Sequence, residues 1–168
     1  MENKDSIFNE INKNCCFTGH RALTADQIKR IKLQINRAVK ALASTGVTNF
    51  ITGGALGFDT VAAECVLELK DKGHEVRLLV AVPCRDQSER WKPRDIAVYN
   101  RILAAADETV CLSENYSREA MLARNRFMVD HSSCCLAFVT EEKSGSAYTM
   151  RYAGQTGKQV INLAEVSW

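Results

Sequence analysis

Short apolar runs alternate with longer amphipathic stretches along the whole chain. The apolar runs are rich in β-branched residues, which predicts buried strands at 15–18, 47–52, 76–82, 109–112, 134–139 and 160–163. The stretches between them carry apolar residues at steps of three and four, which predicts helices. We expect these helices to begin near Thr24, Asp59, Pro93, Ser117 and Ser146.

Boundary signals support this alternation. Thr24 and Gln27 have the spacing of a capping box, and Gly46 and Gly73 follow the first two helical patterns as terminating glycines. Strands that alternate with helices are joined by right-handed crossovers into a mostly parallel sheet. The sequence therefore predicts an α/β fold, a single Rossmann-like three-layer α/β/α sandwich with a mostly parallel sheet of about six strands.

Length and composition fit one globular domain. The chain has 168 residues, of which 46% are hydrophobic and 25% are charged. We detect no internal repeat and no low-complexity linker. We expect residues 1–168 to form a single domain with its core at about 14–163.

Charge and hydropathy narrow the class of partner. The net charge is +2 and no long basic run is present, which argues against a nucleic-acid partner. No apolar run approaches the ~20 residues that span a bilayer, and the polar N-terminal segment does not resemble a secretion signal. The seven cysteines lie mostly in apolar runs, where reduced cysteine acts as a small hydrophobe. These features favour a cytoplasmic protein that does not contact a membrane.

Ligands of open α/β sheets bind beyond the carboxyl ends of the strands, so the loops there are the candidate site. After the first strand come Gly19, His20 and Arg21. The glycine allows a close backbone approach, and the arginine offers a planar fork for phosphate or carboxylate. The same residues could equally form a tight turn with a solvated arginine.

The loop after the second strand is the stronger candidate. Three glycines in five positions precede a predicted helix, which suits an anion because backbone N–H groups and the helix dipole both favour negative charge. Asp59 could cap that helix or accept hydrogen bonds from a ribose. The spacing matches neither a Walker loop nor the dinucleotide fingerprint. The candidate binding residues in this loop are Gly53, Gly54, Ala55, Gly57 and Asp59.

Three further loops contribute candidates. Gln87 precedes Trp91, and this pair could read a base or merely cover the sheet edge. Cys84 is expected to be a structural thiol, since no histidine has a sequence reason to lie near it. After the fourth strand come Asn115 and Arg118. The fifth loop again places glycine and serine at a helix start, with Gly145, Ser146 and Ala147.

No metal site and no bound cofactor are indicated. The doublets Cys15-Cys16 and Cys134-Cys135 lack metal-ligand spacing. Two anion-binding helix starts on one rim would instead suit a diphosphate or a nucleotide.

Taken in order, these motifs resemble the YpsA-like branch of the SLOG superfamily, which is related to the LOG proteins and to the Rossmann domain of DprA. The resemblance runs from about Cys15 to Leu163. It rests on CFTGHR at 16–21, TGGALGFD at 52–59, Gln87 with Trp91, Arg124-Asn125 with Met128-Val129-Asp130, and GSAY at 145–148.

The resemblance implies a Rossmann-like fold and a nucleotide or nucleotide-derived ligand, with ADP-ribose as one type, held by a sensor or sequestering module. It also implies pairing into a homodimer. LOG enzymes hydrolyse the N-glycosidic bond of nucleoside monophosphates with a Pro-Gly-Gly-x-Gly-Thr-x-x-Glu motif. The segment at 52–59 lacks that glutamate, and Glu64 has a different offset.

Two alternatives stay open at this point. The first is an N-glycosidase, phosphoribohydrolase or ribosyl transferase on a nucleotide, for which Asp59 and Glu114 are the carboxylates on the rim. The second is DNA binding of the DprA type, which the balanced net charge disfavours.

Overall fold

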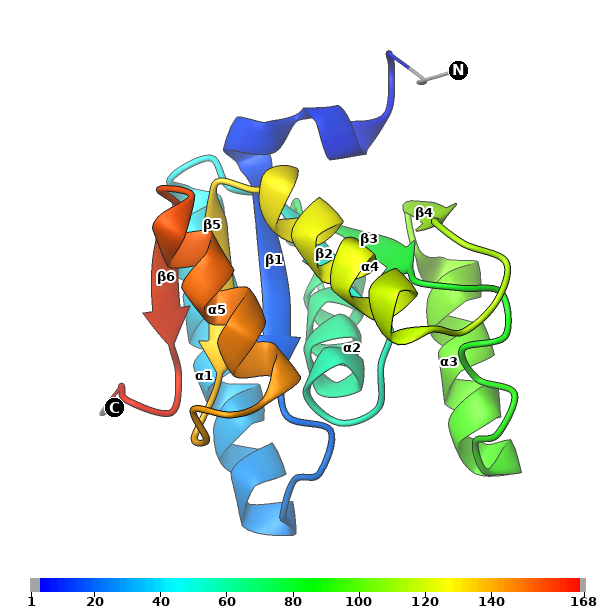
Figure 1. Ribbon diagram of the computed structural model, residues 1–168. Helices are drawn as coiled ribbons and strands as arrows, with labels where there is room; N and C mark the ends of the chain where they lie inside the picture. Colours follow the sequence, from blue (N-terminus) through cyan, green and yellow to red (C-terminus); the bar gives the residue numbers. More distant parts are fainter. Residues whose placement is uncertain (1–3, 167–168) are drawn as a thin grey trace.

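A single six-stranded parallel sheet forms the centre of the computed structural model, which describes residues 4–166 (Figure 1). Its strand order is β4-β3-β2-β1-β5-β6. The predicted α/β fold is thereby confirmed. The strands are β1 (Asn14–Gly19), β2 (Asn49–Thr52), β3 (Arg77–Val82), β4 (Glu108–Cys111), β5 (Cys134–Phe138) and β6 (Gln159–Asn162).

Five α-helices cover the two faces of this sheet. The helices α1 (Ala25–Ser44), α2 (Phe58–Asp71) and α3 (Pro93–Ala105) lie on one face. The helices α4 (Arg118–Asp130) and α5 (Gly145–Gln155) lie on the other, in front of the sheet in Figure 1. No helix within residues 4–166 is long and apolar enough to span a membrane.

The helix ends follow from the sequence signals. At α1 the Thr24 hydroxyl accepts from the Gln27 N–H while the Gln27 side chain accepts from the Thr24 N–H, so the predicted capping box forms. Pro93 occupies the first turn of α3, where its missing N–H leaves no bond unmade. Ser117 and Ser144 cap α4 and α5 with their hydroxyl groups.

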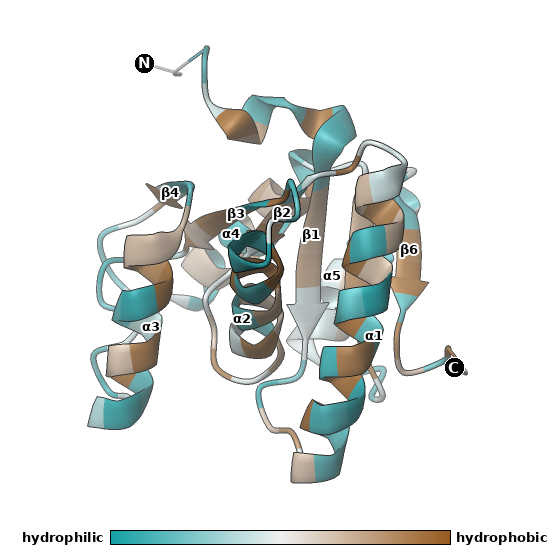
Figure 2. Cartoon of the chain, turned by 180° about the vertical axis from the view of Figure 1, so that it is seen from behind, coloured by the Kyte–Doolittle hydropathy of each residue, from teal (hydrophilic) through white to brown (hydrophobic). Residues whose placement is uncertain are grey.

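The core lies in two layers, one on each side of the sheet, and the outer faces of the helices are polar (Figure 2). Strands β1, β2, β3 and β5 are buried, as predicted. The prediction of buried strands is wrong for β4 and β6, whose residues are half-buried or exposed. Both are edge strands, so they are covered less completely than the central ones.

The strand order reverses between β1 and β5. From β1 the chain adds β2, β3 and β4 on one side, then returns to place β5 on the other side of β1. Loops that leave neighbouring strands in opposite directions open a crevice at this point, where ligands of such folds bind. At the other end of the sheet, beside the amino ends of the strands, lie two short 3₁₀ turns, Ile7–Asn9 and Ile11–Lys13.

Candidate functional site

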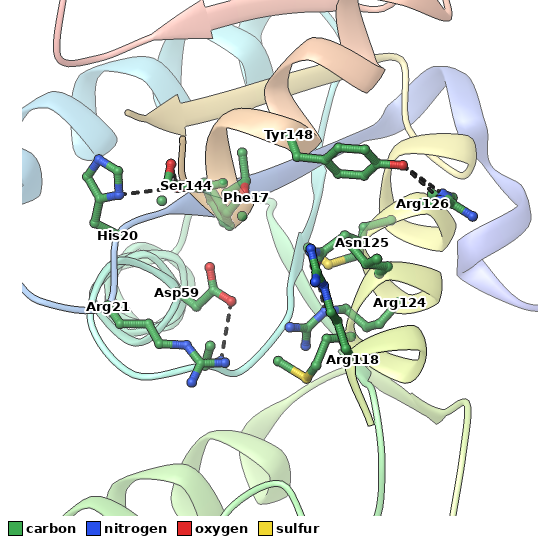
Figure 3. A pocket seen from close by; sticks show the side chains of 18 of the residues that line it. Phe17, His20, Arg21, Asp59, Arg118, Arg124, Asn125, Arg126, Ser144 and Tyr148 are labelled. Atoms are coloured by element: carbon green, nitrogen blue, oxygen red, sulfur yellow. Dashed lines mark hydrogen bonds between the residues drawn. The ribbon is translucent and has the colours of Figure 1, made fainter. Parts of the chain in front are cut away.

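A cleft with two adjoining parts lies at the carboxyl ends of the strands. The larger part, here called the cationic lobe, has a volume of about 770 Å³ and is bounded by the β1–α1 loop, the start of α2, the α4 wall and the start of α5 (Figure 3). The smaller part, the aromatic lobe, measures about 500 Å³, and the residues that line it alone are Asp86, Gln87, Glu89, Arg90 and Trp91. The two lobes share Arg21, Tyr116 and Met121.

Basic side chains dominate the cationic lobe. Six of them line it, and none forms an ion pair within the described chain; they are Arg21, Arg118, Arg124, Arg126, Lys143 and Arg151. Asp59 is the only carboxylate among the described residues of the lining. Positive charge gathered in a cleft with low-dielectric walls focuses an attractive potential on anions.

His20 joins the β1–α1 loop to the β5–α5 loop across the point where the strand order reverses. Its Nε2 accepts a hydrogen bond of 2.8 Å from the Thr140 N–H, so that nitrogen carries no proton. Nδ1 is then the protonated nitrogen of the neutral ring and donates to the Ser146 hydroxyl at 3.3 Å. A Ser146 oxygen that accepts from His20 keeps its own hydrogen, and in the free protein it donates this hydrogen to Ser144 Oγ at 3.2 Å, because the Ser144 hydroxyl donates to the Glu141 carbonyl. His20 in this tautomer cannot take a proton from Ser146.

The start of α5 keeps unsatisfied donors. The first N–H groups of a helix have no partner inside the helix. Ser144 caps the N–H of Ala147, the third residue of α5. Gly145 and Ser146 precede that bond and line the lobe, so this helix start presents donors and positive dipole potential to the cleft.

The glycine-rich turn after β2 is organised differently from what its sequence suggests. The Gly54 N–H donates to the Thr52 hydroxyl and the Ala55 N–H donates to the Asp59 carboxylate. The Phe58 N–H donates to the His20 carbonyl. These donors are therefore used inside the protein, and the expectation that this turn holds an anion mainly with its own N–H groups does not fit its bonding.

Two of the glycines allow one part of the chain to pack on another. A Cβ at Gly57 would lie 2.2 Å from the Arg21 carbonyl oxygen, and Gly57 has a φ of +80°. A Cβ at Gly19 would lie 2.3 Å from the Phe58 ring. These contacts hold the β1–α1 loop against the start of α2, which fixes the position of Arg21 at the junction of the lobes.

Arg124 lies buried beneath the glycine-rich turn. Its Nη1 donates to the carbonyls of Gly53 at 2.5 Å and Ala81 at 3.2 Å, and its Nε donates to Asn125. A Cβ on Gly53 would lie 2.6 Å from Arg124 Nη1 and 2.8 Å from Asp59 Oδ2. Gly53 is thus the residue that leaves room for a buried cation and a buried carboxylate.

Burial perturbs both of these ionisable groups. Removal from water raises the pKa of Asp59, and the nearby Arg124 charge and the Ala55 N–H oppose this rise. Burial likewise lowers the pKa of Arg124, which the Asp59 charge opposes. The two charges support each other in a place where neither is well solvated.

More residues of α4 line the cationic lobe than the sequence predicted. The sequence analysis names only Arg118 of this helix as a binding residue, but Arg124, Asn125 and Arg126 also line the cationic lobe beside it. Arg126 donates to the Tyr148 hydroxyl, which ties α4 to α5 (Figure 3). The signal that could have revealed them is their place in the ordered motif at 124–130.

The predicted site residues separate into three groups. Those that line the cationic lobe are Gly19, His20, Arg21, Ala55, Asp59, Arg118, Gly145 and Ser146, and Gln87 lines the aromatic lobe. Four that support the walls without lining them are Gly53, Gly54, Gly57 and Ala147. Asn115 is exposed and lines neither lobe.

Two groups considered for chemistry lie outside the cleft. Cys84 is buried, and burial together with Asp86 raises the pKa of its thiol to about 11, which is the condition of a structural thiol. Glu114 is exposed, pairs with Arg85 at 3.1 Å and does not line the cationic lobe. Asp59 is then the one carboxylate of the two that borders the cleft.

Sheet order, crevice and cationic lining together define a Rossmann-like α/β domain with an anion-suited cleft at its topological switch point. A model of the YpsA family, described as the YspA SLOG family, matches residues 15–163, and the chain belongs to this family. This confirms the resemblance drawn from the sequence motifs.

Individual relatives agree with this assignment. The chain is 34% identical to the SPbeta prophage-derived protein YoqJ of Bacillus subtilis over 128 residues, which covers 68% of this chain and 75% of that protein. It is 31% identical to a UPF0398 protein of Bacillus thuringiensis over 134 residues, which covers 78% of this chain and 73% of that protein.

Solved structures of DNA processing protein A (DprA) share the fold. The Helicobacter pylori protein, described with a single-stranded DNA binding mode, aligns with a TM-score of 0.64 and 24% identity over 93% of this chain and 67% of that one. The Streptococcus pneumoniae protein aligns with a TM-score of 0.67 and 19% identity over 91% of this chain and half of that one. At these identities the likeness concerns the fold.

Proposed function

We propose that this protein binds a phosphate-bearing, nucleotide-derived molecule in the cationic lobe, as a sensor or sequestering module. The observation that carries the proposal is the lining of that lobe, with six basic side chains that form no ion pair within residues 4–166 and a single buried carboxylate. Such a lining is electrostatically costly when empty and is relieved by a polyanion.

The proposed contacts follow from the geometry. The Ser146 hydroxyl and the N–H groups at the start of α5 donate to phosphate oxygens, and Arg118 and Arg21 neutralise their charge. Arg124 contributes charge from below while it holds the Gly53 carbonyl. Asp59 is fixed by the Ala55 N–H and supports Arg124, a role that needs no turnover of the ligand.

Calorimetric titration tests this proposal. Inorganic pyrophosphate and ADP-ribose are expected to bind the native chain, and Arg118→Ala is expected to weaken both about tenfold. Arg77→Ala is the matched control, because Arg77 is an exposed arginine at the amino end of β3, and the cleft lies at the carboxyl ends of the strands. Equal affinities for the two variants would contradict the proposal.

Turnover is checked on the same samples. Incubation with nucleoside monophosphates, ADP-ribose and NAD, followed by chromatography for released base, is expected to show no product. Released base that disappears in Asp59→Asn would favour the N-glycosidase or ribosyl transferase alternative instead.

Single-stranded DNA is a second candidate. It is favoured by the continuity of the two lobes and by Tyr116, a residue that is 64% exposed where they meet, since exposed aromatics beside cations stack bases. The fold shared with DprA adds to this. Fluorescence anisotropy with a labelled oligonucleotide, at low and physiological salt, tests it; binding that pyrophosphate does not displace would place DNA elsewhere.

A further inference from the structure

The aromatic lobe differs from the cationic lobe in the charge of its lining. It carries two basic residues, Arg21 and Arg90, and two acidic ones, Asp86 and Glu89. This balanced lining does not select for a polyanion. Because the lobes share Arg21, Tyr116 and Met121, one ligand can place its phosphates in the first and an uncharged group in the second.

Two aromatic side chains line this lobe. The half-buried ring of Trp91 packs edge-on against Tyr99, with centroids 5.2 Å apart, which fixes its orientation. Tyr116 is largely exposed at the junction of the lobes. A flat group that enters the lobe therefore meets aromatic surface from two separate segments of the chain.

Gln87 adds a requirement for hydrogen-bond donors. Its side chain is among the buried polar ones, with 9% of the residue exposed, and its Nε2 donates to the Gly53 carbonyl and the Tyr99 hydroxyl. A carbonyl oxygen can only accept, so the contact of 3.4 Å with the Gly53 carbonyl assigns the nitrogen of the Gln87 amide to this side. Its Oε1 is left with no hydrogen-bond partner in the described chain.

Asp86 repeats this feature beside it. Its Oδ1 is also buried and accepts no hydrogen bond within residues 4–166. A buried acceptor without a donor is costly, so an N–H group that reaches it binds favourably. Both oxygens are covered in the free protein, so a ligand reaches them only after nearby side chains shift.

A third buried acceptor without a partner, on Gln34, shows which part of this pattern points to a ligand. Gln34, between α1 and the chain after β6, donates to the Leu163 carbonyl and also keeps an unpartnered Oε1. Gln34 lines neither lobe of the cleft. Gln87 combines the unpartnered acceptor with a cavity, aromatic walls and a neighbouring cationic lobe.

From this combination we infer that the aromatic lobe is a subsite for a nucleobase with an exocyclic amino group, whose N–H donors meet Gln87 and Asp86 while its ring contacts Trp91 and Tyr116. This inference rests on the proposed function, because the phosphates of the same molecule occupy the cationic lobe. The base can belong to a free nucleotide or to single-stranded DNA.

The test compares inorganic pyrophosphate, ADP, GDP and IDP by calorimetry on the native chain. IDP lacks the amino group that ADP and GDP carry, so at least one of those two is expected to bind about tenfold tighter than IDP. Equal affinity of IDP with both would overturn the inference and leave the proposed function standing. Failure of all four to bind would overturn the proposed function.

A second comparison assigns the discrimination to Gln87. In Gln87→Met, the tighter of ADP and GDP is expected to bind no better than IDP, while pyrophosphate still binds as it does to the native chain. Gln34→Met, the same change at a buried glutamine outside the cleft, is the control and is expected to keep the tighter binding over IDP. A preference unchanged in folded Gln87→Met would overturn the role of Gln87. If that variant does not fold, the native-chain comparison decides. Competition with oligo(dA) and oligo(dI) distinguishes a base in DNA from a free nucleotide.

Discussion

Asp59, on a helix of one face of the sheet, and Arg124, on a helix of the other face, approach the same glycine. The carboxylate and the guanidinium each lie within 2.8 Å of the place that a Cβ of Gly53 would occupy. Gly53 is therefore required for space, because its own carbonyl binds Arg124 and its missing side chain leaves room for both charges.

Gly53→Ala tests this relationship. The added methyl group must displace Arg124 or Asp59, and we expect it to lower the free energy of unfolding by about 1–3 kcal/mol. Gly145→Ala is the control, because nothing lies within 4 Å of the Cβ it would add. Urea unfolding of both variants measures the difference. Equal stability would show that Arg124 and Asp59 can shift to make space for the methyl group without cost.

The raised pKa of Asp59 predicts how stability depends on pH. The folded state holds the Asp59 proton more tightly than the unfolded state, so the stability from this group is present below its ordinary pKa of 3.8 and is lost as pH rises through the raised value. Asp59→Asn is therefore expected to be more stable than the native chain at pH 8, with a gain that shrinks toward pH 4.

Unfolding curves at pH 4, 6 and 8 measure this gain. A gain of the same size at every pH would mean that the Asp59 charge is not its cause. A loss of stability at pH 8 would mean that the attraction between Asp59 and Arg124 exceeds the cost of burying the carboxylate.

The tautomer of His20 predicts the chemistry of Ser146. Since Nδ1 carries the proton, Ser146 is a hydrogen-bond donor to a ligand and not an activated nucleophile. Ser146→Ala should weaken pyrophosphate binding about threefold to tenfold, and a fluorophosphonate probe should not label the native chain at Ser146. Ser44→Ala, at the far end of α1, is the control for binding. Covalent labelling of Ser146 would refute this assignment.

Salt should weaken binding in the cationic lobe. Pyrophosphate affinity is expected to fall steadily as sodium chloride increases, and Lys143→Ala is expected to make this dependence shallower because one cation fewer contributes. Lys72→Ala changes a lysine at the end of α2 that lies away from the cleft, and it should leave the salt dependence of pyrophosphate affinity unchanged. Affinity that is insensitive to salt would indicate binding by uncharged contacts.

The arrangement of the sheet could be predicted from the sequence because its signals are local. The capping box at Thr24 forms as its spacing predicts, and α3 and α4 begin at Pro93 and directly after Ser117, where the sequence places their starts. The edge position of β4 and β6 is not local, because it depends on strand order. Their partial exposure was therefore missed.

The candidate site was predictable in outline and not in detail. Sequence places His20, Arg21 and Ser146 on one rim, and all three line the cationic lobe. The net charge of +2 concealed that lobe, since its six cations come from four separate segments and converge only after folding. The buried role of Arg124 was equally hidden, because its partners lie on β3 and in the turn after β2.

The most direct test of the account is a nuclear magnetic resonance titration of the ¹⁵N-labelled chain with inorganic pyrophosphate. We expect the backbone signals of Gly145 and Ser146 and the Nε signals of Arg21 and Arg118 to shift together and saturate, while the signals of Lys72 and Arg77 do not move. Shifts confined to other surfaces, or no saturable shift at any residue, would contradict the proposal that this cleft holds a phosphate-bearing ligand.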